Sequence, residues 1–196
     1  MRTLALAAAV LCVPSLVLAA DGPKPEEKFV ALFDGKTLDG WKVEKCEVEV
    51  QDGCVLLKGG NGWMHTEKQY GDFVLELEFK ALKKEGFDSG VYVRAEARPE
   101  KANWPARNQI NLRQDLFCQI KEIKEAAAHP ELAKPGEWNQ MRVTVIGKMA
   151  TLEMNGKKAW KIDSLKKPTG YIGLQCEVPG GGQFLFRNIR ISQRTP

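Results

Sequence analysis

The chain of 196 residues has 28% charged and 43% hydrophobic residues, 18 glycines and 10 prolines, a composition typical of globular proteins. This composition excludes a collagen, a coiled coil and a disordered chain, and the length suits one domain. The formal net charge is +4 with both signs interspersed along the chain, which argues against nucleic acid as a partner.

The beginning of the chain predicts a signal peptide. Arg2 gives a short positive start, and an apolar stretch follows that ends in the small residues Ala19 and Ala20. The apolar stretch is shorter than the roughly 20 residues that a membrane-spanning helix needs. We therefore expect residues 1–20 to be removed and residues 21–28 to form a flexible lead-in. The mature protein is expected to be periplasmic or secreted, with no membrane anchor.

Four cysteines remain after the predicted cleavage: Cys46, Cys54, Cys118 and Cys176. They permit two disulfides by any of three pairings, with buried free thiols as the alternative. A hairpin over residues 43–58 with its turn at Asp52-Gly53 puts Cys46 and Cys54 on opposite faces, which argues against a bond between them. Without a CxxC pair or neighbouring histidines, no metal or other cofactor is predicted. Calcium bound by amide and carboxylate oxygens stays open.

Alternating apolar and polar residues predict β-strands along most of the remaining chain. The alternation is clearest in residues 73–79, and it recurs in 142–146, 150–154 and 184–191. Asn155-Gly156 is a strong hairpin signal and makes residues 142–162 a three-stranded meander. Residues 120–129 combine features of a helix and of a strand and stay undecided. Many short strands indicate an all-β sandwich or barrel.

Several strings of residues carry a resemblance to a known family. They are Leu32-Phe-Asp-Gly-Lys-Thr-Leu-Asp-Gly-Trp41, Asp88-Ser-Gly-Val-Tyr-Val-Arg94 and Phe186-Arg-Asn-Ile189. In this order they resemble the 3-keto-disaccharide hydrolase domain family, as a single domain over residues 29–193. The resemblance implies an all-β, concanavalin A-like jelly-roll sandwich of two antiparallel sheets with at most one or two short helices. It also implies an exported protein of sugar-degrading bacteria, and some family members cleave glycosides already oxidised to a ketone at C3.

The chemistry of a 3-keto glycoside defines what such a site needs. The ketone acidifies the hydrogen on C2, so a base that removes it allows elimination of the group on C1, followed by addition of water. The site then needs a base of suitable pKa, a cation or metal beside the enolate oxygen, and an acid for the leaving group. Strand alternation predicts one polar face formed by three strands. Its side chains are Tyr92, Arg94 and Glu96, then Gln109, Asn111 and Arg113, then Gln175 and Glu177.

Candidate roles follow from these side chain types. Arg94 is expected to polarise substrate oxygens, with a plain solvated position as the alternative, and Glu177 to act as base or acid. Asp88 is interpreted as a turn cap. Tyr92 and Trp104 are stacking platforms, although Trp104 packed on the rim is an equal alternative. The expected substrate-binding residues are Tyr92, Glu96, Trp104, Gln109, Asn111, Gln175 and Arg187, the last re-aimed by a bulge.

Two departures from the family pattern bear on catalysis. Gln109 stands where a glutamate is usual, and Cys176-Glu177 replaces an aspartate and a histidine. Because glutamine is not a general base near neutral pH, Glu177, Glu96 or Glu122 must supply one, or the chain binds sugar without cleaving it. The first hypothesis is an exported enzyme acting on 3-keto glycosides. The alternatives are a non-catalytic carbohydrate-binding module of the same fold and a cell-envelope interaction domain.

Overall fold

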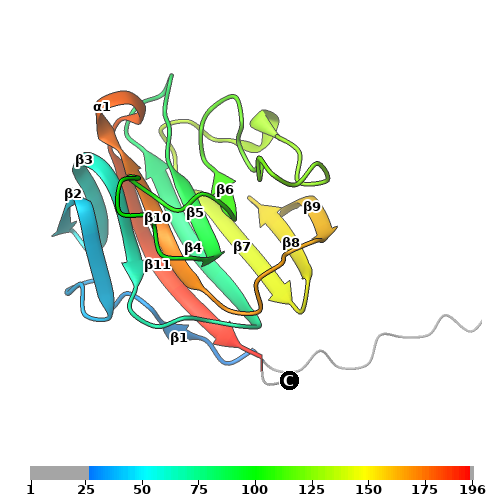
Figure 1. Ribbon diagram of the computed structural model, residues 1–196. Coiled ribbons are helices and arrows are strands. Elements are labelled where there is room, and N and C mark those ends of the chain that lie inside the picture. The colour runs from blue at the N-terminus through cyan, green and yellow to red at the C-terminus, as the bar shows by residue number, and fades with distance from the viewer. Residues whose placement is uncertain (1–26, 195–196) are drawn as a thin grey trace, which may run out of the picture.

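A computed structural model describes residues 27–194, and its regular structure is almost entirely antiparallel β-sheet (Figure 1). The signal peptide predicted for residues 1–20 lies outside the described residues. A 3₁₀-helix at Pro130–Leu132 and the short helix α1 at Val178–Gly181 complete the structure. No helix within residues 27–194 is long and apolar enough to cross a membrane. The strands are β1 (Val30–Ala31), β2 (Trp41–Gln51), β3 (Cys54–Thr66), β4 (Phe73–Ala81), β5 (Gly90–Ala95), β6 (Gln109–Asn111), β7 (Asn139–Ile146), β8 (Met149–Met154), β9 (Lys157–Asp163), β10 (Tyr171–Glu177) and β11 (Phe184–Gln193).

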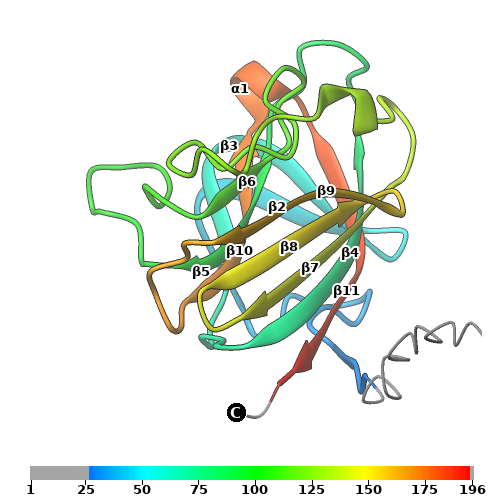
Figure 2. The same cartoon turned by 90° about the vertical axis from the view of Figure 1, so that its right-hand side faces the viewer.

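The long strand β3 links two layers of sheet. Its first half pairs with β11, and its second half, from Asn61 to His65, pairs with β10. The back sheet therefore runs β3-β11-β4-β7-β8-β9, and the front sheet runs β3-β10-β5-β6. Strand β2 follows the other edge of β3, and β1 pairs with the end of β11. Figure 2 shows β7, β8 and β9 toward the viewer with β2, β3 and β10 behind them, which confirms the predicted sandwich of antiparallel sheets.

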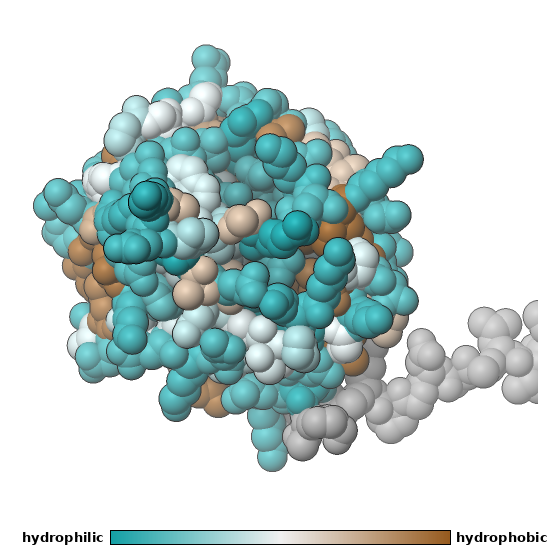
Figure 3. All heavy atoms as spheres, in the orientation of Figure 1, coloured by the Kyte–Doolittle hydropathy of each residue, from teal (hydrophilic) through white to brown (hydrophobic). Residues whose placement is uncertain are grey.

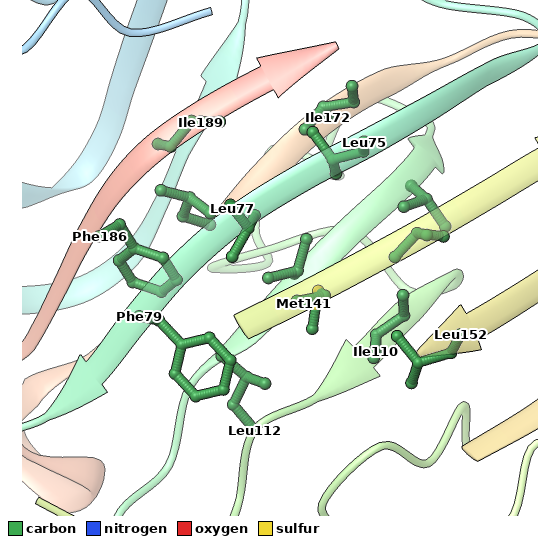
Figure 4. Close-up of a cluster of buried hydrophobic side chains, with 14 of the residues drawn as sticks. Leu75, Leu77, Phe79, Ile110, Leu112, Met141, Leu152, Ile172, Phe186 and Ile189 are labelled. Carbon is green, nitrogen blue, oxygen red and sulfur yellow. The ribbon is translucent and has the colours of Figure 1, made fainter. Parts of the chain in front are cut away.

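The core lies between these two sheets. In β4, Phe73, Leu75, Leu77 and Phe79 are at most 2% exposed, whereas the alternate glutamates face outward. Apolar residues of the front sheet, such as Ile110 and Ile172, meet them from the other side (Figure 4). The period-two pattern thus buries one face of each sheet in a shared apolar layer. In the orientation of Figure 1, the outer surface is mostly hydrophilic with small apolar patches (Figure 3).

Two hairpin turns form where the sequence predicts them. Asp52 and Gly53 have φ of 50° and 74°, and Asn155 and Gly156 have φ of 52° and 76°. Positive φ at both central residues matches the twist of the flanking strands, and glycine and asparagine tolerate it best. The β2-β3 hairpin and the β7-β8-β9 meander are therefore confirmed.

Residues 120–129, left undecided from the sequence, form turns rather than a helix or a strand. The amide of Ile123 donates to the carbonyl of Ile120 at 2.9 Å, and the amide of Ala126 donates to that of Ile123 at 3.1 Å. Each contact closes one turn without propagating into a helix. The stretch is therefore neither a helix nor a strand, and the 3₁₀-helix at Pro130–Leu132 begins directly after it.

Candidate active site

The outer face of the front sheet carries most of the polar residues predicted for the site. Ile110, Leu174 and Cys176 point into the core, as predicted, so Gln175 and Glu177 lie on the opposite face. Glu177 is at the end of β10, opposite Asn61 of β3. The predicted phase of β6 and β10 is confirmed.

A chain of hydrogen bonds orients Glu177. The side-chain amide of Gln109 donates to Oε1 of Gln175, and Nε2 of Gln175 donates to Oε2 of Glu177 at 2.8 Å. Gly90 lies between β6 and β10, where any Cβ atom would collide with the Gln109 amide. Gln175 is 3% exposed, so it holds the Glu177 carboxylate in place and is not itself open to a substrate. The structure therefore brings Gln109, Gln175 and Glu177 together.

Glu177 shares a cavity of about 320 Å³ with Asp88, which lies just before β5. Burial raises the pKa of Asp88 to about 7, and the Glu177 carboxylate adds to this shift. Burial also raises the pKa of Glu177. Arg113 lines the same cavity and opposes both shifts. The cavity thus holds two carboxyl groups of raised pKa beside one cation.

The burial of Asp88 comes from the turn that follows β10. Its amide donates to the carbonyl of Gly181 at 3.1 Å, and a Cβ atom on Gly181 would collide with Asp88. Helix α1 therefore packs directly on the residue. Arg113 donates to both carboxylate oxygens of Asp115, at 2.5 and 2.7 Å, which holds its guanidinium at the rim.

Sequence reasoning missed Asp88 and Arg113 as members of the site. Asp88 precedes Ser89-Gly90, a sequence that predicts a turn cap. Strand alternation predicts Arg113 on the polar face, as the structure has it, but indicates no role for it. The available signal was the combination of an acid at the start of β5 with polar residues facing outward from its two neighbouring strands.

The prediction that Arg94 points outward from the sheet is wrong. Arg94 is 1% exposed, because a bulge in β5 gives this strand one residue more than β10 between two paired positions. Arg94 sits in this bulge with φ of 48°. The bulge turns its side chain away from the face that carries Glu177.

The guanidinium of Arg94 binds three loops. It donates to the carbonyls of Gly71 at 2.8 Å, Gly147 at 2.6 Å and Lys167 at 3.0 Å, and to Oδ1 of Asp72 at 2.6 Å. Its donors are occupied by the protein itself, so we assign Arg94 a structural role and not the expected catalytic one.

The middle of the predicted polar face is covered. The segment between β5 and β6, which we call the covering loop (residues 96–107), folds back over Tyr92, which is fully buried. Trp104 of this loop packs half-buried against Tyr92 and Trp63. Lys45 holds the loop by donating to the carbonyl of Ala102 at 2.9 Å. Tyr92 is therefore not an open stacking platform, and Trp104 takes the alternative role of a packed rim residue.

This packing leads to a prediction for Trp104→Ala. Loss of a half-buried indole is expected to lower the free energy of unfolding by about 1–2 kcal/mol and to increase quenching of Trp63 fluorescence by acrylamide. Chemical denaturation and quenching titrations measure both effects. Lys101→Ala, an exposed position on the same loop, serves as the control and should change neither. A stable Trp104→Ala variant with an unchanged Trp63 signal would contradict the packing role.

Two glutamates proposed as alternative bases lie outside the Glu177 cavity. Glu96 is exposed and pairs with Lys167 at 2.7 Å. Glu122 accepts a hydrogen bond from the backbone amide of Asn108 at 2.5 Å. Both line a separate cavity of about 430 Å³ beside the covering loop. Asn111 stays on the outer face of β6, opposite Gly90.

Arg187 lies on the back sheet, away from the Glu177 cavity. The predicted bulge is confirmed between Arg187 and Arg190. The Arg187 guanidinium pairs with Glu78 at 2.7 Å and lies 3.8 Å from the centre of the Trp138 ring. Trp138 is half-buried and not part of the core.

A larger cavity of about 630 Å³ opens on the back sheet, but its Glu76 carboxylate is already paired with two arginines. The front cavity is therefore the better candidate for proton transfer.

The fold and the cavity define a jelly-roll sandwich domain with a pair of carboxyl groups where β5 begins and β10 ends in its front sheet. The chain belongs to the 3-keto-alpha-glucoside-1,2-lyase-like domain family, whose model matches residues 28–192. A curated relative, named 3-keto-disaccharide hydrolase, from Bacteroides thetaiotaomicron is 27% identical over 159 residues. That match covers 63% of this chain and 54% of the relative, so the chain spans about half the relative's length.

Solved structures share the fold. Two crystal structures from Parabacteroides distasonis, both provisionally named glycosyl hydrolases, superpose with TM-scores of 0.68 and 0.64 at 20% and 26% identity. Each superposition covers 85% of this chain, and 94% and 100% of the other chains. The carbohydrate-binding module CBM66 from Bacillus subtilis has a TM-score of 0.57 at 13% identity, covering 79% of this chain and 96% of the module. These matches confirm the jelly-roll sandwich.

Proposed function

We propose that this protein cleaves glycosides that carry a ketone at C3 of the sugar. The observation that carries the proposal is the cavity in which Asp88 and Glu177 lie beside Arg113, with the pKa of both carboxyl groups raised. Carboxyl groups of raised pKa in a shared cavity are typical of acid–base sites. Family membership and the name of the curated relative support the choice of substrate.

The roles follow from the surroundings of the two carboxyl groups. Glu177 is the base, because the side-chain amide of Gln175 donates to its carboxylate and favours the ionised form, and it removes the proton on C2. Arg113 stabilises the negative charge that develops on the C3 oxygen. Asp88, half protonated near pH 7, gives its proton to the oxygen that leaves C1. Addition of water to the resulting unsaturated ketone puts a hydroxyl on C1 and a hydrogen on C2.

An unpaired side-chain oxygen opposite Glu177 supports a ligand rich in hydroxyl groups. Asn61 Oδ1 and Trp63 Nε1 are buried without a hydrogen-bond partner within residues 27–194. The two residues are opposite Glu177 and Gln175 on the neighbouring strand. A buried donor or acceptor left unpaired costs about 1–3 kcal/mol. A hydroxyl group both donates and accepts, so a sugar suits the Asn61 oxygen beside Glu177 better than an apolar ligand does, whereas Trp63 is closed off by the covering loop.

The proposal is tested with a matched pair of substrates. A disaccharide oxidised at C3 and the same disaccharide unoxidised are each incubated with the purified protein, and the released sugar is quantified. We expect release from the ketone alone. Saturable binding without release would favour the carbohydrate-binding module instead. Equal release from both sugars would indicate an ordinary glycosidase and would contradict the elimination.

A further inference from the structure

The outer face of the back sheet carries a groove that the proposed cleavage does not use. Two cavities of about 630 and 220 Å³ form it, and they are continuous, because Glu78 and Gln140 line both. The larger cavity runs from β1 over β11, β4 and β7 to β8, which lie side by side in the sheet (Figure 2). At about 4.8 Å between neighbouring strands, this stretch measures about 19 Å. The two cavities together, which we call the back groove, are therefore longer than one sugar ring.

Strand pairing arranges the polar side chains of the back groove in two rows. One row crosses β11, β4 and β7 through Arg187, Glu78 and Gln140, which are direct partners in the register. The other row lies two residues further along β4 and β7 and reaches Glu153 on β8. Glu78 accepts from Arg187 at 2.7 Å, whereas the exposed side chains of Gln140 and Glu153 make no hydrogen bond or ion pair within residues 27–194. An amide and a carboxylate are thus available to a ligand.

The bulge in β11 adds a third available group. The register shifts between Arg187 and Arg190, so Arg187 and Asn188 both lie on the outer side, and Ile189 returns to the core. Asn188 has φ of 53°, a left-handed conformation that asparagine adopts more readily than most residues. Its exposed side chain lines the larger cavity and makes no hydrogen bond in the described part of the chain. Two amides and a carboxylate can both donate to and accept from hydroxyl groups.

Apolar surface and balanced charge complete the back groove. Trp138 lines the smaller cavity, where the stacked Arg187 guanidinium holds its ring, and Phe33 lines the larger one. Three glutamates and three arginines line the two cavities, and Lys134 adds one positive charge at the rim. A strongly charged ligand would gain little from charges that nearly cancel. A sugar, in contrast, can pack its C–H groups on an aromatic ring and pair its hydroxyl groups with amides.

We propose that the back groove binds an uncharged oligosaccharide without cleaving it. Glu76 and Glu78 are paired with arginines, which leaves Glu153 as the single free carboxylate of the groove within residues 27–194. Cleavage by an acid and a base needs a second free group, as in the cavity of Glu177 on the front sheet. A glycan bound on the back sheet leaves that front cavity open. The proposal goes beyond the function proposed above and does not rest on it.

The test measures binding of four uncharged hexasaccharides to the full chain by calorimetry at pH 7. The probes are maltohexaose, cellohexaose, mannohexaose and xylohexaose, with hexagalacturonate as the charged comparison. We expect saturable binding of at least one uncharged probe, nearly unchanged between about 50 and 500 mM salt, because screening does not affect a neutral ligand. If none of the four binds, or if only the hexagalacturonate does, the proposal is wrong.

Matched variants locate the bound sugar. Gln140→Ala removes one exposed amide and should weaken the binding about fivefold, and Trp138→Ala should weaken it about tenfold or more. Thr144→Ala, on the same strand and the same face as Gln140 but outside the back groove, should retain the parent's affinity. Melting temperatures check that each variant is folded.

The front sheet provides the opposing variant. Gln109→Ala should leave the binding of the hexasaccharide intact, because Gln109 lies beside the Glu177 cavity. Affinity that falls in Gln109→Ala but is normal in Gln140→Ala and Trp138→Ala would assign the sugar to the front sheet and overturn the proposal. These readouts need no turnover. A chain that binds the hexasaccharide through the back groove and cleaves no 3-keto glycoside would support this proposal and contradict the proposed cleavage alone.

Discussion

Replacing Arg94 with alanine is expected to lower the free energy of unfolding by about 3–5 kcal/mol. The guanidinium is 1% exposed and connects Gly71, Asp72, Gly147 and Lys167, which belong to three different loops. Its removal takes a donor from three carbonyl groups and from the Asp72 carboxylate, whose Oδ1 still accepts from the amide of Gly147 at 2.9 Å. Partial rehydration of Asp72, the more exposed partner, limits the loss to this range. Urea denaturation of the variant and the parent protein measures the difference.

Two further variants separate the hydrogen bonds from the charge. Arg94→Lys keeps the positive charge but cannot reach all four acceptors, so it should fall between the parent and Arg94→Ala. Arg107→Ala removes an exposed arginine and should change the stability by no more than about 0.5 kcal/mol. If Arg94→Ala were as stable as Arg107→Ala, the buried position of the side chain would be wrong.

The sandwich could be predicted because its determinants are local. In β4, alternation from Phe73 to Phe79 specifies which face is buried, independently of any partner strand. Asn155-Gly156 specifies its own turn through backbone conformation. Such features repeat within a few residues, so the phase of most strands is correct. The family strings then select the jelly-roll arrangement among the possible sandwiches.

The site was predicted less completely because its determinants are long-range. Strict alternation through β5 gives the correct phase for Tyr92, but the bulge at Arg94 depends on pairing with β10. The cover over Tyr92 comes from a loop held by Lys45, far away in the sequence. Burial of Asp88 depends on Gly181. These contacts cannot be predicted from any local sequence pattern. The outward orientation of Glu177, in contrast, follows from the alternation along its own strand.

The substitution Glu177→Gln is expected to lower kcat on a 3-keto glycoside by about 10² to 10⁴-fold, with little change in binding. Glutamine keeps the shape and the hydrogen bond to Gln175 but cannot accept the C2 proton. Rapid-mixing or steady-state kinetics and calorimetric binding measure the two quantities. Glu137→Gln, an exposed acid outside the cavity, serves as the control and should retain full activity. A normal kcat in the Glu177→Gln variant would contradict the assignment of Glu177 as the general base.

Asp88→Asn is expected to lower kcat by a similar factor and to change the pH dependence. The active form of Asp88 is protonated, so kcat/KM of the parent should fall as the pH rises through about 7, and this fall should disappear in the variant.

The stability of the fold should also depend on the protonation of Asp88. The native state holds the Asp88 proton more tightly than the unfolded chain, so stability declines as the pH rises from the ordinary carboxyl range toward 7. At pH 8, where Asp88 is ionised while buried beside Glu177, the asparagine variant should therefore have the higher melting temperature, whereas near pH 4 the two proteins should be alike. A variant that loses activity but keeps the parent's alkaline fall would place the titrating group elsewhere in the protein.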